Sequence, residues 1–115
     1  MTPFGLEPGV AVVLYLHSPR EKLWGILLSL ETAGIVIRGL DVSVFDDWVR
    51  QEIRGEEGIG LSTLFYPMSR VERMERDESA GPIESLSERF EREVGRSVRV
   101  VMGLVAGLEG GGPSN

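Results

Sequence analysis

The chain has 115 residues, of which 42% are hydrophobic and 26% charged, as expected for one soluble globular domain with a modest core. Its formal net charge is −6, and Lys22 is its one lysine. Nonspecific nucleic-acid affinity comes mainly from cations that release counterions from phosphate, so an acidic chain is a poor candidate for broad binding to nucleic acids or anionic membranes.

Three apolar, strand-like segments come first in the chain, at 10–16, 23–30 and 35–40. The connections 18–21 and 31–34 are too short for a parallel crossover, which needs a dozen residues or more, so we expect an antiparallel meander. The first two segments are apolar at both alternate positions. This pattern predicts cover by a core on one face and by a helix or a partner chain on the other.

Two glycines mark places where these strands are expected to bend. Gly25 lies inside the second strand, and Gly39 lies near the end of the third. A glycine within a strand often marks a sharp bend or a close approach of two backbones, as in small barrels. We therefore expect the sheet to bend at Gly25, with Gly39 as a second candidate, and to curl into a small barrel.

A helical period begins after the third strand and predicts a helix over 43–54. Ser43 and Asp46 resemble a capping box, which makes Ser43 the expected N-cap. We expect Trp48 to hold this helix over the mouth of the barrel. The apolar side of the helix consists of Phe45, Trp48, Val49 and Ile53.

A glycine-rich loop and two more strands follow. The loop 55–60 contains three glycines, but its two glutamates would repel phosphate and no Walker lysine follows, so a flexible loop is the better interpretation. We expect a fourth strand at 61–66, stopped by Pro67, and a fifth at 69–75. Alternating charge signs in the fifth indicate an exposed edge strand, where charge discourages unwanted pairing.

The C-terminal part contains a second helix and two less regular segments. Ser85 begins a capping box and Gly95 is the expected C-cap, so we predict a helix over 85–94. The segment 97–102 is interpreted as a sixth strand or a partner-binding strand. The glycine-rich segment 103–115 is predicted to be a disordered tail.

The order of these segments resembles the Sm-like (LSm/Hfq-like) family of small β-barrels over about half of the chain. Gly25 lies at the family's bend, and the pair Arg38-Gly39 is similar to the Arg-Gly pair of eukaryotic Sm proteins, one strand earlier. The resemblance implies a barrel and a tendency to assemble into rings. The matching segments are 12–16, 22–29, 35–37 and 65–71.

Several positions depart from the family's RNA-binding pattern. Pro67 and Met68 replace its uridine-binding Lys-His pair, and Glu31 replaces the aspartate after the second strand. The base-stacking Gln-Phe or Met-Asn pair is missing. The helix 43–54 is an insertion, and the helix 85–94 follows the barrel instead of preceding it. The resemblance therefore does not imply that these residues bind RNA.

Candidate catalytic residues are few. His17 is the only histidine, and a lone imidazole with no cysteine and no placed carboxylate is more often structural than a base or a ligand. Asp46 and Asp47 diverge on their helix and are better explained by its N-terminus than by a metal. We interpret Asp77 and Glu78 as solvated loop acids. No catalytic, metal or cofactor site is predicted, and the chain is not expected to be an enzyme.

Four residues are candidates for contact with a partner or with RNA: Arg38 in the third strand, and Tyr66, Met68 and Arg70 around the end of the fourth. Tyr66, Met68 and Arg70 combine an aromatic ring, a soft side chain and an arginine, which together suit such a contact, and Arg38 is a candidate for contact with RNA. The alternative is that Tyr66 and Met68 fill the end of the barrel. Aromatic residues at strand spacing are usually core, which favours this alternative.

The compartment is predicted from what the sequence lacks. With no cysteine there are no disulfides and no thiolate metal sites, so a reducing cytoplasm is the simplest assignment. The N-terminus lacks a basic region followed by an apolar core, so no signal peptide is expected. The apolar runs are far shorter than the roughly 20 residues of a membrane span.

Together these patterns predict a mainly β fold with two helices in a single domain over 1–102. We expect a small, strongly bent, five-stranded antiparallel barrel of Sm-like or SH3-like type, with one helix between strands 3 and 4 and another after strand 5. The leading functional hypothesis is a non-enzymatic interaction or assembly module of a bacterial-type cytoplasm, without cofactors, which forms a homo-oligomer or binds a protein partner. The alternatives are an RNA-binding Sm-like protein and a small enzyme that uses His17.

Overall fold

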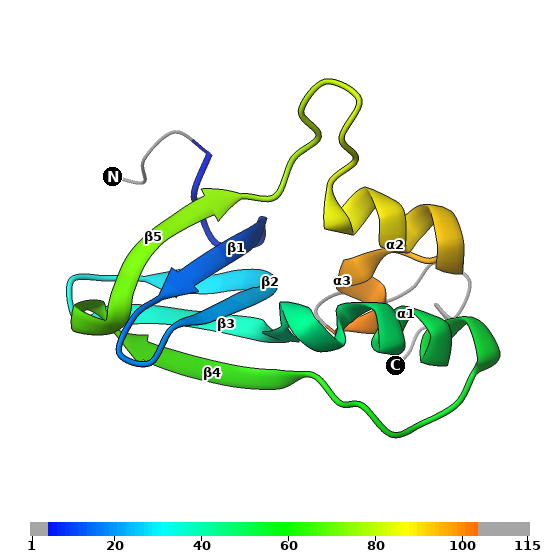
Figure 1. The fold of residues 1–115 in the computed structure, drawn as a ribbon, viewed down its shortest axis with the longest axis horizontal. Coiled ribbons are helices and arrows are strands. Elements are labelled where there is room, and N and C mark those ends of the chain that lie inside the picture. Colours follow the sequence, from blue (N-terminus) through cyan, green and yellow to red (C-terminus); the bar gives the residue numbers. More distant parts are fainter. Residues whose placement is uncertain (1–4, 104–115) are drawn as a thin grey trace, which may run out of the picture.

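The computed structural model describes residues 5–103 as a curled β-sheet with three helices gathered against one side of it (Figure 1). The strands are β1 (Ala11–Leu16), β2 (Glu21–Leu30), β3 (Gly34–Asp41), β4 (Ser62–Pro67) and β5 (Val71–Arg76). The helices are α1 (Phe45–Arg54), α2 (Leu86–Val94) and α3 (Val98–Val101), with single 3₁₀ turns η1 (Val42–Val44) and η2 (Met68–Arg70). No helix in this part of the chain is long and apolar enough to cross a membrane.

All neighbouring strands pair antiparallel, in the order β4-β3-β2-β1-β5. The predicted five-stranded antiparallel sheet is therefore confirmed, and each expected strand lies within a few residues of its observed position. The two edge strands, β4 and β5, are not hydrogen-bonded to each other. The sheet is consequently open along this seam and does not form a closed barrel.

The short connection between the two edge strands requires the sheet to curl. In a flat five-stranded sheet, β4 and β5 would lie about 19 Å apart, which is four strand spacings. Only the three residues of η2 separate the end of β4 from the start of β5. A 3₁₀ turn of this length rises only about 6 Å, so the two edges approach each other closely at that end.

Two glycines allow the close approach of β2 and β3. Gly25 and Gly39 are directly opposite each other in the β2–β3 register. A Cβ atom added to Gly25 would clash with the Arg38 carbonyl oxygen, and one added to Gly39 would clash with the Trp24 carbonyl oxygen. The predicted role of both glycines in a close backbone approach is confirmed.

The inner face of the curled sheet forms one of two apolar cores. It draws half-buried side chains from both edge strands, including Leu64 and Tyr66 of β4 and Val71 and Met74 of β5. Because both edges contribute to the same cluster, this face is the concave one. Its buried members are Val12, Leu14, Leu16, Leu23, Leu27, Ile35 and Ile37.

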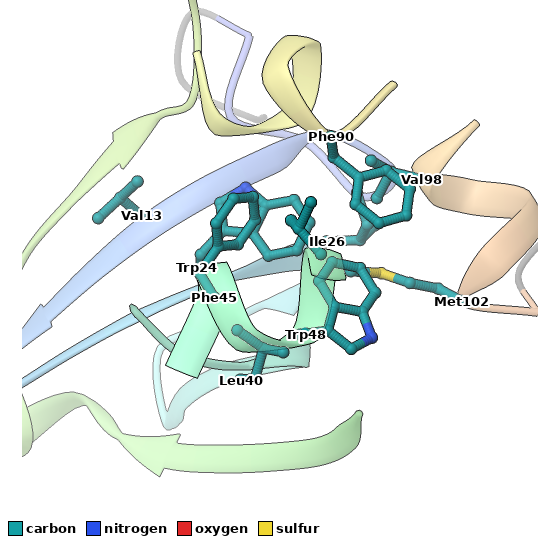
Figure 2. Close-up of a cluster of buried hydrophobic side chains, with 10 residues drawn as sticks. Val13, Trp24, Ile26, Leu40, Phe45, Trp48, Phe90, Val98 and Met102 are labelled. Atoms are coloured by element: carbon teal, nitrogen blue, oxygen red, sulfur yellow. The ribbon is translucent and has the colours of Figure 1, made fainter. Parts of the chain in front are cut away.

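The outer face of β1–β3 forms the second core with the helices (Figure 2). Trp48 of α1 stacks on Phe90 of α2 with ring centroids 4.5 Å apart, and Phe45 meets the edge of Trp24 at 5.0 Å. The predicted cover of strands that are apolar on both faces is thus provided by the protein's own helices. Trp48 holds α1 on the outer face of the sheet and not over the end of a barrel.

The start of the first helix differs from the prediction. Asp41, the last residue of β3, accepts a hydrogen bond from the Ser43 backbone N–H at 2.8 Å and caps η1. Ser43 is therefore inside a 3₁₀ turn, and the prediction that it caps the helix was wrong. The residue before α1 is Val44, which has no side-chain cap.

The second helix has the predicted caps, whereas the segment after it has a different structure. Ser85 Oγ accepts from the Glu88 N–H at 3.0 Å, and Gly95 ends α2 with φ of 83°. The prediction of a strand over 97–102 was wrong, because Val98 and Met102, one helical turn apart, are both buried against the helices, in and just after α3. Of the predicted disordered tail only Gly103 is described, and 104–115 lie outside the described residues.

Asp77 joins the sheet, the outer core and α2. Its Oδ2 accepts from Trp24 Nε1 at 2.9 Å and from Ser87 Oγ at 2.7 Å, and its Oδ1 accepts from the Leu86 N–H at 3.0 Å. The interpretation of Asp77 as a solvated loop acid was therefore wrong. The unpaired N–H groups at the start of a helix attract a carboxylate, even one that is distant in sequence.

Candidate interaction surface

Arg38 lies on the outer face of β3, between β4 and the end of α3. Its Nε donates to the Met102 carbonyl oxygen at 3.2 Å, and its Nη1 donates to Thr63 Oγ1 at 3.2 Å. The residue is half-buried and faces a depression of about 320 Å³ against α1 and the loop 55–60. Its guanidinium group thus connects α3 to the sheet through protein oxygens.

The glycine-rich loop and the C-terminal part of α1 carry acidic side chains into the same depression. Glu52, Glu56 and Glu57 contribute to its lining, which disfavours phosphate. The side chain of Gln51 both donates to the Ile59 carbonyl oxygen at 2.8 Å and accepts from the Ile59 N–H at 2.6 Å. The loop expected to be flexible is therefore fixed at this point.

Tyr66 and Arg70 meet beside η2, where the two edge strands approach each other. Arg70 Nε donates to the His17 carbonyl oxygen at 2.8 Å, and its Nη2 contacts Glu21 Oε2 at 2.9 Å. Its guanidinium carbon lies 5.7 Å from the centroid of the Tyr66 ring. Burial, and next the negative charge of Glu21, raise the pKa of the Tyr66 hydroxyl, while the charge of Arg70 opposes the shift.

The four residues predicted from the sequence do not form one patch. Tyr66 packs into the inner core, whereas Arg38 lies on the outer face, three positions along the β3–β4 ladder. Met68 is 37% exposed at η2, near Tyr66 and Arg70. The structure thus brings three of the residues together and separates Arg38 from them.

Phe65 is an exposed aromatic residue that the sequence reasoning did not single out. Its side chain is 57% exposed on the outer face of β4. Its ring lies over the backbone of Gly34, so that a Cβ on Gly34 would be only 2.7 Å from Phe65 Cε1. It borders a depression of about 150 Å³ that also includes Val36 and Ser29. Alternation within β4 would not have indicated this outward position, because Leu61 and Phe65 alternate with Leu64 and Tyr66.

The two sheet edges differ in charge. β5 carries Glu72, Arg73, Glu75 and Arg76, all exposed. In contrast, residues 58–69, which contain all of β4, have no charged side chain. Charge on an edge strand discourages pairing with another chain, so β5 is protected as predicted and β4 is not.

A third surface surrounds Tyr15, which lies in β1 between β2 and the edge strand β5. Tyr15 is opposite Lys22 in the β1–β2 ladder and opposite Arg73 in the β1–β5 ladder. The Lys22 Nζ lies 5.2 Å, and the Arg73 guanidinium carbon 4.0 Å, from the centroid of its ring. Together with Arg20 and Glu72 these residues line a depression of about 450 Å³. Side chains alternate between the two faces of each strand, and this alternation is the signal that would have placed Tyr15, Lys22 and Arg73 on the same face.

His17 is exposed at the end of β1. Its Nδ1 lies 3.2 Å from Ser18 Oγ, and its backbone N–H donates to the Arg70 carbonyl oxygen at 3.0 Å. Within residues 5–103, no three histidine or acidic side chains are arranged to hold a metal ion. Within the described part of the chain, the His17 imidazole forms no ion pair with a carboxylate.

Comparison with known proteins does not assign this chain to a family. No protein-family model, no curated protein and no solved structure matches the chain.

Proposed function

We propose that this chain is a non-enzymatic interaction and assembly module whose copies associate through a sheet edge. The observation that carries the proposal is the edge strand β4, which combines an exposed Phe65 with the uncharged run 58–69. Natural proteins normally protect an edge strand with charge, a bulge or a covering element. β5 is protected by charge, whereas β4 has no charged side chain and its one protective residue is Pro67 at its end.

The helices limit where a partner would bind. Strands apolar on both faces were the first reason to expect self-association, but α1, α2 and α3 cover the outer face of β1–β3. That cover does not extend to Phe65 and Met68, which remain exposed. Ile53 and Ile83 are exposed as well, but Phe65 and Met68 are the pair that adjoins the uncharged sheet edge, so the β4 edge and η2 are the surface we assign to a partner.

We also propose that the curled sheet is a partly open barrel of Sm-like or SH3-like architecture. The strand order, the glycine pair Gly25 and Gly39 at the close approach of β2 and β3, and the single 3₁₀ turn between the two edge strands support this assignment. The cysteine-free composition supports a cytoplasmic setting.

RNA binding is a second candidate function, and the depression beside Tyr15 favours it. Arg20 and Lys22 form no ion pair with any residue between 5 and 103, so their charges are available. Cations beside an aromatic ring are the usual basis of binding to single-stranded nucleic acid. In contrast, Arg38 and Arg70 donate to protein oxygens.

The oligomeric state in solution tests the leading proposal. Light scattering coupled to size-exclusion chromatography over a wide concentration range should detect a species larger than the 12.7 kDa monomer. A monomer at every concentration would refute it.

Fluorescence anisotropy with U-rich and A-rich RNA tests the second candidate. Binding should weaken with added salt and with Lys22→Ala, but not with Arg38→Ala. A failure to bind RNA at low salt would refute this second function.

A further inference from the structure

The backbone of β4 presents its odd-numbered residues to solvent. The Met68 N–H donates to the Ala33 carbonyl oxygen at 3.0 Å, which continues the β3–β4 register and makes this a hydrogen-bonded pair. Since such pairs alternate along an antiparallel ladder, the even-numbered residues of β4 bond to β3. The backbone groups of Thr63, Phe65 and Pro67 therefore point away from β3, and Pro67 has no N–H.

The opposite edge is a poor match for these groups. On β5 the Asp77 N–H donates to the Ala11 carbonyl oxygen at 2.9 Å, so by the same alternation Met74 and Arg76 present their backbone groups outward. This edge carries side chains of both charge signs, and the whole chain has a net charge of −6. An uncharged β4 strand from a second copy is the partner that meets β4 without burying a charge.

We propose that two copies pair their β4 strands antiparallel about a two-fold axis at Phe65. The inference rests on the proposed self-association and specifies its interface. In this register the Phe65 N–H of each copy donates to the Phe65 carbonyl of the other, and the Thr63 N–H donates to the Pro67 carbonyl. Both outward donors find acceptors, and the missing N–H of Pro67 is not required.

The side chains select this register. Centring the axis on Leu64 would also satisfy the donors, but it would place each Phe65 opposite a Thr63. Centring it on Phe65 places the two exposed rings opposite each other on the outer face, where a cross-strand aromatic pair is favourable. The half-buried Val36, next to Phe65 in the β3–β4 ladder, extends the apolar surface under the pair. The result is one continuous sheet with closed two-fold symmetry.

Two substitutions at Thr63 test the interface in the full chain. Thr63→Pro removes an outward N–H but no bond to β3, while Thr63→Val keeps the N–H and controls for the lost contact with Arg38. We expect a wild-type dimer, an unchanged dimer for Thr63→Val, and a dissociation constant raised at least about tenfold for Thr63→Pro, since two symmetric bonds are lost. Sedimentation velocity measures all three.

Amide hydrogen exchange on the unmodified protein gives a second readout that does not depend on a variant. The amides of Thr63 and Phe65 should exchange more slowly as concentration rises, and those of Met74 and Arg76 should not change. Assembly that survives Thr63→Pro, or that contains more than two copies and protects Met74 and Arg76, would overturn the β4 interface while leaving self-association in place. A wild-type monomer at all concentrations would overturn both.

Discussion

The indole Nε1 of Trp24 donates a hydrogen bond to Oδ2 of Asp77 at 2.9 Å, across 53 positions of the sequence. Trp24 is fully buried in the outer core, and Asp77 follows directly after β5. The same carboxylate accepts from the backbone N–H groups of Leu86 and Ser87 at the start of α2. The Asp77 side chain therefore fixes the position of α2 relative to both the sheet and the buried Trp24.

Removing this carboxylate should loosen α2 from the sheet. We expect Asp77→Ala to lower the free energy of unfolding by about 2–3 kcal/mol, because the indole and the first turn of α2 lose their acceptor. Urea denaturation followed by tryptophan fluorescence measures the loss. The neighbouring Glu78→Ala is the matched control and should change stability by less than about 0.5 kcal/mol. Equal effects from the two substitutions would contradict the role given to Asp77.

The glycine pair between β2 and β3 should tolerate no side chain. A methyl group on Gly25 or Gly39 would meet backbone atoms of the facing strand, which cannot move away as a flexible side chain would. We expect Gly25→Ala and Gly39→Ala each to cost about 2 kcal/mol or more. Gly60→Ala is the control, because nothing lies within 4 Å of its added Cβ. Thermal unfolding of the three variants decides, and a stable Gly25→Ala protein would refute the close approach.

Local signals in the sequence predicted much of the sheet. Short connections between apolar segments allowed only antiparallel pairing, and a glycine inside each of two strands located the close approach. The Ser85 cap and the Gly95 stop were also readable, because each depends on neighbouring residues. The helix over 98–101 was missed since its β-branched residues favour a strand, and only burial of Val98 and Met102 against distant helices decides the outcome.

The candidate surface was less predictable. Asp77 and the exposed Phe65 acquire their roles from partners far away in the sequence, Trp24 for the first and the free edge of the sheet for the second. The pattern of β4 alone does not say whether Phe65 or Tyr66 faces the core. The β3–β4 register decides, because it places Phe65 beside Val36 on the outer face and Tyr66 beside the buried Ile35 on the inner face.

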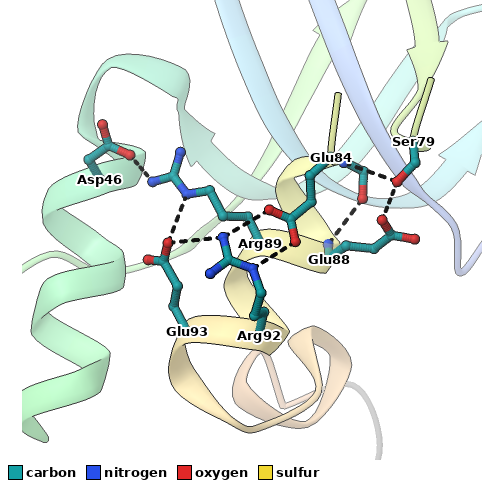
Figure 3. Close-up of polar contacts among 8 residues, drawn as sticks. Asp46, Ser79, Glu84, Glu88, Arg89, Arg92 and Glu93 are labelled. Atoms are coloured by element: carbon teal, nitrogen blue, oxygen red, sulfur yellow. Dashed lines mark hydrogen bonds and ion pairs between the residues drawn. The ribbon is translucent and has the colours of Figure 1, made fainter. Parts of the chain in front are cut away.

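The contact between α1 and α2 should weaken in acid. Arg89 of α2 binds Asp46 of α1 and also lies 3.6 Å from Glu93 (Figure 3). The hydrogen bond and charge of Arg89 lower the pKa of Asp46 below its usual 3.8. A lowered carboxyl pKa contributes stability that is present above pH 3.8 and is lost as the pH falls through the lowered value.

A double-mutant cycle isolates this ion pair. Asp46→Asn and Arg89→Met should show favourable coupling at neutral pH that disappears as the pH falls below about 3.8. Asp47 lies in the same first turn but pairs with Arg50, so Asp47→Asn is the control and should show no coupling to Arg89→Met. Coupling that is the same at neutral and acid pH would contradict the assignment to the Asp46 carboxylate.

Tyr66 should make the protein less stable in alkali. Burial and the nearby Glu21 raise the pKa of its hydroxyl above 10.0, so the folded state holds the proton more tightly than the unfolded chain. The corresponding stability is fully present below pH 10 and is lost as the pH rises through the raised pKa. Tyr66→Phe should remove this loss, so its free energy of unfolding should fall less steeply above pH 10.

The tyrosinate absorbance of the wild type minus that of Tyr66→Phe should titrate above pH 10, because Tyr15 is the only other tyrosine. A midpoint at or below 10 would contradict the burial of the Tyr66 hydroxyl.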